Sequence, residues 1–204
     1  MSEKIITIAL DAMGGDHGVQ SVIPGAALCL QEHPNIRFLV FGDRAAIAVE
    51  LAQHPDLQRV CEIIHTDLKV ESGQKPSAAL RASKGTSMRL AIEAVDEGRA
   101  QAVVSSGNTG ALMALAKLVL KPVPGIHRPA LASVWPTYAG TCIMLDLGAN
   151  VLVDAENLAQ FAVLGAVFAK AHSKITNPRV GLLNVGSEAI KGPEHVRGAA
   201  KVLE

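Results

Sequence analysis

Short apolar runs alternate along the chain with longer helix-favouring stretches, and this alternation predicts its elements. Runs rich in β-branched residues, typical of buried strands, occupy residues 5–10, 36–41, 60–64 and 102–104. Helix-favouring stretches occupy residues 19–32, 44–53, 83–97 and 112–120. Because strands and helices alternate across short links, the pattern predicts a parallel sheet with helices on its faces.

The alternation of predicted strands and helices is interrupted at two places. Residues 66–82 hold few apolar positions and predict a long irregular link, the kind of segment that often carries function. After a proline-rich bend at 122–129, two apolar runs at 131–135 and 141–145 predict a hairpin and therefore one antiparallel edge. The remaining pattern predicts helices at 156–171 and 193–204, and a last strand at 180–183.

Polar loops rich in glycine follow four of the predicted strands. They occupy residues 11–18, 105–110, 146–150 and 184–192. In an open parallel sheet, ligands bind beyond the carboxyl ends of the strands, and these ends share one edge. We therefore expect the four loops to converge there.

The 105–110 loop combines a strand end with the start of a helix. The first backbone N–H groups of a helix lack partners, and the helix dipole adds partial positive charge. Gly107 and Gly110 would let a ligand approach the backbone, while Ser106, Asn108 and Thr109 add polar groups. This pattern predicts an anion site, most plausibly for phosphate. The alternative is an ordinary capped turn, because Ser, Asn and Thr are common N-caps.

The 11–18 loop carries two acids, a histidine and three glycines. Asp11, Asp16 or His17 could orient a nucleophile or hold a proton, or the aspartates could serve only as turn and capping residues. The loop is not a GxGxxG fingerprint, and the chain has no GxxxxGK[ST] motif, so no nucleotide site is indicated.

Charge and composition narrow the class of protein. The net charge is zero, which argues against nucleic acid as a partner. Residues 98–145 contain no Asp or Glu but hold four Lys or Arg, among them Arg128. This region would attract an anionic substrate or an acidic partner, unless the gap in acidic residues is a chance feature. No apolar run spans a bilayer and no signal-peptide pattern is present, so we expect a cytoplasmic protein.

Cysteine and histidine spacing gives no support for a metal or a protein nucleophile. The three cysteines, Cys29, Cys61 and Cys142, lack CxxC spacing and lie in apolar segments, so we expect reduced thiols. The seven histidines form no HxxxH or HExxH pair. We predict no metal and no cofactor.

Five motifs together resemble one family. They occupy residues 10–16, 105–114, 125–130, 145–150 and 181–192, in order along the whole chain. They resemble the PlsX family, the phosphate acyltransferases of bacterial phospholipid synthesis. The resemblance implies a three-layer α-β-α fold with a mostly parallel sheet, similar to phosphotransacetylases and isocitrate/isopropylmalate dehydrogenases. Family members continue past Glu204, so residues 1–204 would form a single α/β domain, the N-terminal portion of a longer enzyme.

The resemblance also implies a reaction, in which a fatty acyl group passes from acyl-[acyl-carrier protein] to inorganic phosphate to give acyl phosphate. It further implies a homodimer that works at or near the cytoplasmic face of the membrane. Phosphate would attack the thioester directly, so the main demands are positioning and stabilisation of the oxyanion. The alternatives are a phosphotransacetylase-like enzyme that uses acyl-CoA and a non-catalytic binding module.

Residue roles follow as hypotheses. The catalytic candidates are Asp11, Asp16, His17, Asn184 and Lys191. The candidates for binding phosphate or substrate are Ser106, Gly107, Asn108, Thr109, Gly110, Arg128, Asp146 and Asn150. Oxyanion stabilisation would come from Lys191, Asn184, Arg128 or loop N–H groups, and the acyl chain would lie along residues 111–120.

Overall fold

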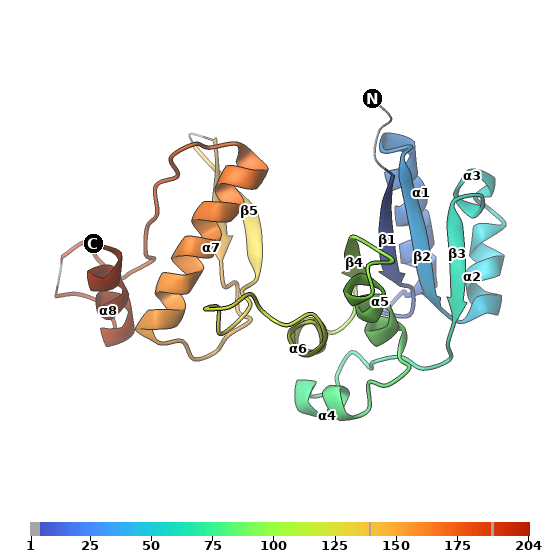
Figure 1. Cartoon of the computed structure of the whole chain (residues 1–204), viewed down its shortest axis with the longest axis horizontal. Helices are drawn as coiled ribbons and strands as arrows, with labels where there is room; N and C mark the ends of the chain where they lie inside the picture. The colour runs from blue at the N-terminus through green and yellow to red at the C-terminus, as the bar shows by residue number, and fades with distance from the viewer. Residues whose placement is uncertain (1–4, 139, 189) are drawn as a thin grey trace. The chain divides into compact units, whose positions relative to one another are not determined.

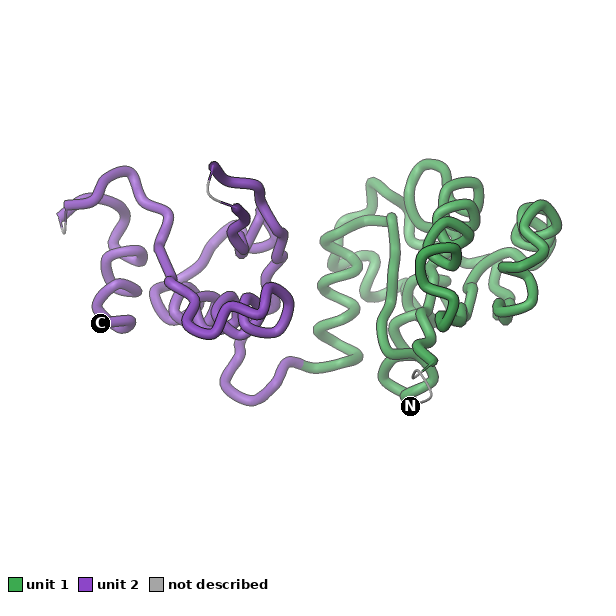
Figure 2. Tube along the Cα trace, turned by 90° about the horizontal axis from the view of Figure 1, so that it is seen from above, with its two compact units in different colours: residues 1–121 green, residues 122–204 purple. Residues whose placement is uncertain are grey.

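The computed structural model describes residues 5–138, 140–188 and 190–204 (Figure 1). By its internal contacts the chain forms two compact units, Met1–Lys121 and Pro122–Glu204, drawn in different colours in Figure 2. Each unit is described by itself below.

The first unit is built on a four-stranded parallel sheet. Its strands are β1 (Ile6–Asp11), β2 (Ile36–Gly42), β3 (Cys61–His65) and β4 (Ala102–Ser105). Their order is β3-β2-β1-β4. The register places Asp11 opposite Phe41 of β2 and Ser105 of β4. The last residues of β1 and β4 are therefore neighbours at one edge of the sheet, as the sequence predicts for the loops that follow them.

Helices cover both faces of this sheet. One face packs against α1 (Val19–Glu32), α2 (Arg44–Leu51) and α3 (Pro55–Gln58). The other face packs against α5 (Ser87–Asp96), which in turn contacts α4 (Pro76–Arg81) and α6 (Thr109–Val119). Side chains such as Ile23, Phe41 and Ile92 are fully buried between the layers. The predicted three-layer α-β-α architecture is confirmed.

The second unit contains an antiparallel hairpin and two helices. The hairpin consists of β5 (Ala132–Thr137) and β6 (Gly140–Leu145), and the helices are α7 (Ala155–Ser173) and α8 (Glu194–Leu203). The hairpin and both helices confirm the sequence predictions, although Ala139 of the predicted turn lies outside the described residues. A capping box at Asp154 begins α7. No helix among the described residues is long and apolar enough to cross a bilayer.

Two expectations are wrong in this unit. Residues 180–183 were expected to form a strand, but they pair with no strand of the described chain. Val180 and Leu183 are 51% and 85% exposed, so these apolar residues do not lie in a sheet core. The strand before the 146–150 loop, β6, belongs to the hairpin and not to the parallel sheet. The premise that four parallel strands carry the four loops therefore holds only for the first two.

Candidate active site

The loops after β1 and β4 contact each other directly. The Ser105 hydroxyl donates a 2.6 Å hydrogen bond to Oδ2 of Asp11, and the Ser106 hydroxyl donates to the carbonyl oxygen of Gly14 at 2.9 Å. These bonds join residues more than 90 positions apart. The parallel register of β1 and β4 explains the contact, because it brings both strand ends to the same level.

Asp11 is the buried centre of this contact, with 1% of its surface exposed. Its Oδ1 accepts a 2.6 Å hydrogen bond from the hydroxyl of Ser87, the first residue of α5, and a longer one from the N–H of Met13. One carboxylate thus joins two strand ends and a helix start. Burial of a carboxylate is costly unless it is hydrogen bonded, and here both oxygens have partners.

Glycines make the close approach of the two loops possible. A side chain on Gly14 would place its Cβ 2.8 Å from the backbone nitrogen of Gly107. Gly15 has a φ of +77°, a conformation that L side chains rarely adopt. Gly14 and Gly107 therefore let one loop lie on the other, and contact of Gly107 with a ligand stays a prediction.

The start of α6 leaves backbone donors without partners. Asn108 is the N-cap, and its Oδ1 accepts from the N–H of Ala111 at 2.9 Å. The N–H groups of Thr109 and Gly110, at the first two helical positions, have no acceptor among the described residues. Since the positive end of the helix dipole lies at the same place, these two N–H groups can bind an anion.

The Asn108 side chain also holds the link that the sequence predicted to be irregular. Its Nδ2 donates to the carbonyl oxygens of Ser72 at 2.7 Å and Gln74 at 3.1 Å. A Cβ on Gly110 would lie 2.9 Å from Cγ of Pro76, in the same segment. Both amide atoms of Asn108 are thus hydrogen bonded within the protein, so it organises the loop around the free N–H groups.

Other candidates of this unit lie at the surface. Asp16, His17, Ser106 and Thr109 are exposed. The side chains of Asp16 and His17 form no hydrogen bond or ion pair with the rest of the described chain. They remain able to contact a ligand, and their predicted roles stay predictions.

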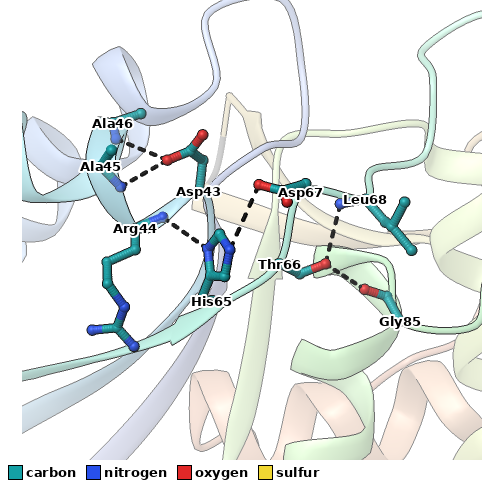
Figure 3. Close-up of polar contacts among 9 residues, drawn as sticks. All are labelled: Asp43, Arg44, Ala45, Ala46, His65, Thr66, Asp67, Leu68 and Gly85. Carbon is teal, nitrogen blue, oxygen red and sulfur yellow. Dashed lines mark hydrogen bonds and ion pairs between the residues drawn. The ribbon is translucent and has the colours of Figure 1, made fainter.

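The same edge of the sheet carries a second polar cluster, after β2 and β3 (Figure 3). His65 lies between the backbone N–H of Arg44, which donates to Nδ1 at 3.2 Å, and the carboxylate of Asp67, 3.7 Å from Nε2. Asp43 caps α2 through hydrogen bonds from the N–H groups of Ala45 and Ala46. The hydrogen bond from Arg44 to His65 joins the start of α2 to the end of β3, so this cluster helps to fix the strand ends.

In the second unit, Arg128, Asp146 and Asn150 form a local group. Nδ2 of Asn150 donates to Oδ1 of Asp146 at 2.9 Å and to the carbonyl oxygen of Pro129 at 3.0 Å. The Arg128 guanidinium donates to the carbonyl oxygen of Leu152 at 3.0 Å. The remaining guanidinium N–H groups of Arg128 form no hydrogen bond with a described residue, so this cation is available to an anionic ligand.

Asn184 and Lys191 occupy one loop and contact each other. Nδ2 of Asn184 donates to the carbonyl oxygen of Lys191 at 3.1 Å. The Lys191 ammonium lies 2.8 Å from Oε1 of Glu188, and this partner lowers the pKa of the Glu188 carboxyl below its usual value. The structure thus brings Asn184 and Lys191 together and pairs the Lys191 ammonium with Glu188.

The structure adds residues that sequence reasoning missed. Ser87 and Ser105 hold Asp11, yet neither was a candidate. The contact of Ser105 with Asp11 could have been predicted, because the two residues end neighbouring parallel strands. The contact of Ser87 could not, because Ser87 lies 76 positions from Asp11 and only the packing of α5 brings it there.

The part of the chain that the structure describes contains no cluster of metal ligands. No group of three or more His, Cys, Asp or Glu residues that could hold a metal occurs there. The three cysteines are free, and burial raises the pKa of the Cys61 thiol to about 12. Cys61 therefore stays protonated at neutral pH and is a poor nucleophile.

The three-layer fold is similar to the folds of solved phosphotransacetylases. The chain is similar to the EutD phosphotransacetylase from Staphylococcus aureus, with a TM-score of 0.63 and 22% identity over 97% of this chain and 63% of that one. A phosphotransacetylase from Streptococcus pyogenes gives a TM-score of 0.65 at 18% identity, over 97% and 65% of the two chains. These similarities establish a phosphotransacetylase-like fold.

Sequence comparison identifies the family. The profile of the family described as fatty acid synthesis protein matches residues 6–204. Relatives named phosphate acyltransferase include one from Parvibaculum lavamentivorans, 54% identical over 97% of this chain and 55% of its own length. Another, from Rhodopseudomonas palustris strain BisB18, is 52% identical over 100% of this chain and 58% of its own length. The chain belongs to this family, the one its motifs resemble, and spans a little over half the length of these relatives.

Proposed function

We propose that this chain carries the phosphate-binding part of an acyltransferase that moves a fatty acyl group from acyl-[acyl-carrier protein] to inorganic phosphate. The observation that supports the site is the pair of unpartnered N–H groups on Thr109 and Gly110, at the positive end of α6. Backbone donors in this arrangement bind phosphate well. The family membership and the names of the relatives support the reaction.

In the proposed reaction, an oxygen of the bound phosphate forms a bond to the thioester carbon, and the carbon–sulfur bond breaks. The thiolate of the carrier leaves and takes up a proton released by phosphate. A thiol has a pKa of about 8.5, so the leaving group needs little acid assistance. Lys191, Asn184 and Arg128 are the proposed oxyanion stabilisers, and Asp16 and His17 are the proposed groups that orient phosphate or hold its proton. Asp146 and Asn150 are proposed substrate contacts.

The proposed surroundings of the reaction follow from the family resemblance. We propose an acyl-carrier protein as the acyl donor, a homodimer as the assembly, and the cytoplasm, at or near the membrane face, as the location. An acidic carrier protein would suit the stretch from residue 98 to 145, which has no acidic residue.

The sharpest test removes one of the two free N–H groups. Thr109 is the first residue of α6, a position that tolerates proline, and the extended backbone of Asn108 suits a following proline. The Thr109→Pro variant therefore deletes a donor without breaking the helix. We expect the phosphate concentration for half-maximal acyl phosphate formation to rise by roughly tenfold or more, as for loss of a charge-assisted hydrogen bond.

Thr109→Ala is the matched control, because it removes the hydroxyl and keeps the N–H group. Hydroxylamine trapping of acyl phosphate, with acyl-carrier protein and acyl-CoA donors compared in parallel, measures the reaction. Equal phosphate dependence in Thr109→Pro and Thr109→Ala would place the site elsewhere. Faster turnover with acyl-CoA would favour a phosphotransacetylase-like enzyme, and no turnover with either donor would favour a binding module.

A further inference from the structure

The environment of Asp11 does not suit a group that touches substrate. Its side chain is 1% exposed, and hydroxyl groups donate to both of its oxygens at 2.6 Å. The backbone of Gly14 covers it so closely that a Cβ there would lie 2.7 Å from Oδ2. Asp11 therefore has no oxygen directed at a ligand, and any effect on the reaction must pass through its neighbours.

Ser105 transmits such an effect to the loop that leads into α6. Its hydroxyl donates to Asp11 and at the same time accepts a 3.1 Å hydrogen bond from the N–H of Gly107. In a chain of hydrogen bonds each member polarises the next, so a carboxylate at one end strengthens the bond at the other. Gly107 precedes the N-cap Asn108, and the unpartnered N–H groups follow at Thr109 and Gly110.

Ser87 ties a third segment to the same carboxylate. Because Ser87 is the first residue of α5, the Asp11 carboxylate lies at the N-terminal end of that helix, where the dipole favours negative charge. The N–H of Ser87 also donates to the carbonyl oxygen of Leu68, at the start of the link that Asn108 holds. The carboxylate thus joins β1, β4 and α5 behind the proposed phosphate site.

We infer that Asp11 is a positioning residue, which acts through the Ser105 hydroxyl on Gly107 and so fixes the backbone donors of α6. Ser87 and Ser105 belong to the same hydrogen-bond network. The kinetic consequence rests on the proposed function, whereas the structural consequence does not. The Ser105→Ala variant cuts the connection while leaving Asp11 its bonds to Ser87 and Met13, so it should fold even if an Asp11→Ala variant does not.

The structural test measures amide hydrogen exchange of Gly107 by NMR in the full chain. Ser105→Ala removes the acceptor of the Gly107 N–H, so we expect its exchange to accelerate by roughly fivefold to tenfold, as for loss of one hydrogen bond. Ser83→Ala is the matched control, because the Ser83 hydroxyl is hydrogen bonded within the same unit but not to Asp11 or Gly107. Unchanged exchange in Ser105→Ala, or equal acceleration in Ser83→Ala, would overturn the inference.

The kinetic test compares Asp11→Asn, Ser105→Ala and the double variant in acyl phosphate formation. If both residues act through one chain of bonds, each raises the phosphate concentration for half-saturation by a similar factor, and the double variant adds little. If the two increases in half-saturating phosphate concentration multiplied in the double variant, the residues would not act through one chain of bonds. A fall in kcat without a change in phosphate dependence would also contradict the inference.

The two tests separate the two claims. If Ser105→Ala accelerates Gly107 exchange but the unsubstituted chain shows no turnover, the positioning role of Asp11 is supported and the proposed reaction is rejected for this form of the protein. If Ser105→Ala turns over with normal phosphate dependence and unchanged Gly107 exchange, the positioning role is rejected and the proposed reaction is supported.

Discussion

The polar loops of the two units resemble each other in sequence but are held in different ways. In the first unit, Asp11 accepts hydrogen bonds from Ser87 and Ser105, 76 and 94 positions away, at the end of a sheet that helices cover. In the second unit, the bonds that link Asn150 to Asp146 and Asn184 to Lys191 span four and seven positions. Bonds from Asn150 to Pro129 and from Arg128 to Leu152 span 21 and 24 positions, so the loops of the first unit differ by the longer range of their contacts.

The burial of apolar side chains also differs between the two units. The first unit buries large side chains such as Phe41, Ile92 and Leu115 completely. In the second unit, Phe161 is buried, whereas Leu183 and Ile190 are more than 80% exposed. A cavity of about 940 Å³ within this unit lies between β6, α7 and residues 173–183. We therefore expect the first unit to depend on contacts of longer range than those of the second unit.

The largest expected difference concerns two isoleucines, one buried in the first unit and one exposed in the second. Ile92→Ala removes a fully buried side chain from the interface of α5 with α6 and should lower the free energy of unfolding by about 2–5 kcal/mol. Ile190→Ala, at a side chain 81% exposed, should change it by less than about 0.5 kcal/mol. Urea denaturation followed by circular dichroism measures both. Similar losses for the two variants would show that the units do not differ in this way.

A smaller difference is expected for two aspartates that follow strands. Asn in place of Asp11 offers one oxygen to two serine hydroxyls, so one hydroxyl loses its acceptor, and we expect a loss of about 2 kcal/mol. Asp146→Asn keeps the oxygen that accepts from Asn150, and asparagine tolerates the φ of +60° at this position. We expect a change within about 0.5 kcal/mol, measured in the same denaturation experiment. A larger loss for Asp146→Asn would reverse the comparison.

These aspartates also show what the sequence could reveal. Apolar periodicity located all four strands of the first unit within one or two residues, and parallel strands then required the ends of β1 and β4 to meet. It could not reveal that Asp11 would be buried, because burial depends on α5 packing over the strand end. For the same reason the sequence could not reveal the role of Ser87 or the contact of the Asn108 amide with the link.

The failure at residues 180–183 has a different cause. A strand is defined by its hydrogen-bonded partner, and a β-branched apolar run can only indicate that it would suit one. Within the described residues no strand pairs with this run. The hairpin of β5 and β6 was predictable because its two halves are close in sequence and specify each other.

An intermediate effect is expected where Asn108 holds the link. Asn108→Asp keeps the oxygen that caps α6 but replaces the amide donor with an oxygen facing the carbonyls of Ser72 and Gln74. We expect a loss of about 1 kcal/mol and faster tryptic cleavage within residues 66–82. Asn184→Asp is the matched change in the second unit, and its bond lies within its own loop. If both variants left cleavage of the link unchanged, the Asn108 amide would have no part in fixing that segment.

The smallest expected effect concerns the Glu188–Lys191 pair, which is local and exposed. Lys191 lowers the pKa of the Glu188 carboxyl because its ammonium stabilises the charged form. A carboxyl whose pKa is lower in the folded than in the unfolded chain favours folding above its unfolded pKa, and this contribution disappears as the pH falls through the folded pKa. Salt screens such an exposed pair, so little stability depends on it.

NMR titration of the Glu188 side chain measures this coupling directly. In Lys191→Gln the largest cause of the shift is absent, so the pKa of Glu188 should rise toward its usual value while the midpoint of urea denaturation stays nearly constant. Lys201→Gln, a change of the same charge at an exposed lysine of α8, should leave Glu188 unaffected. A large fall in stability with Lys191→Gln would mean that this loop, like the loops of the first unit, depends on contacts beyond its own residues.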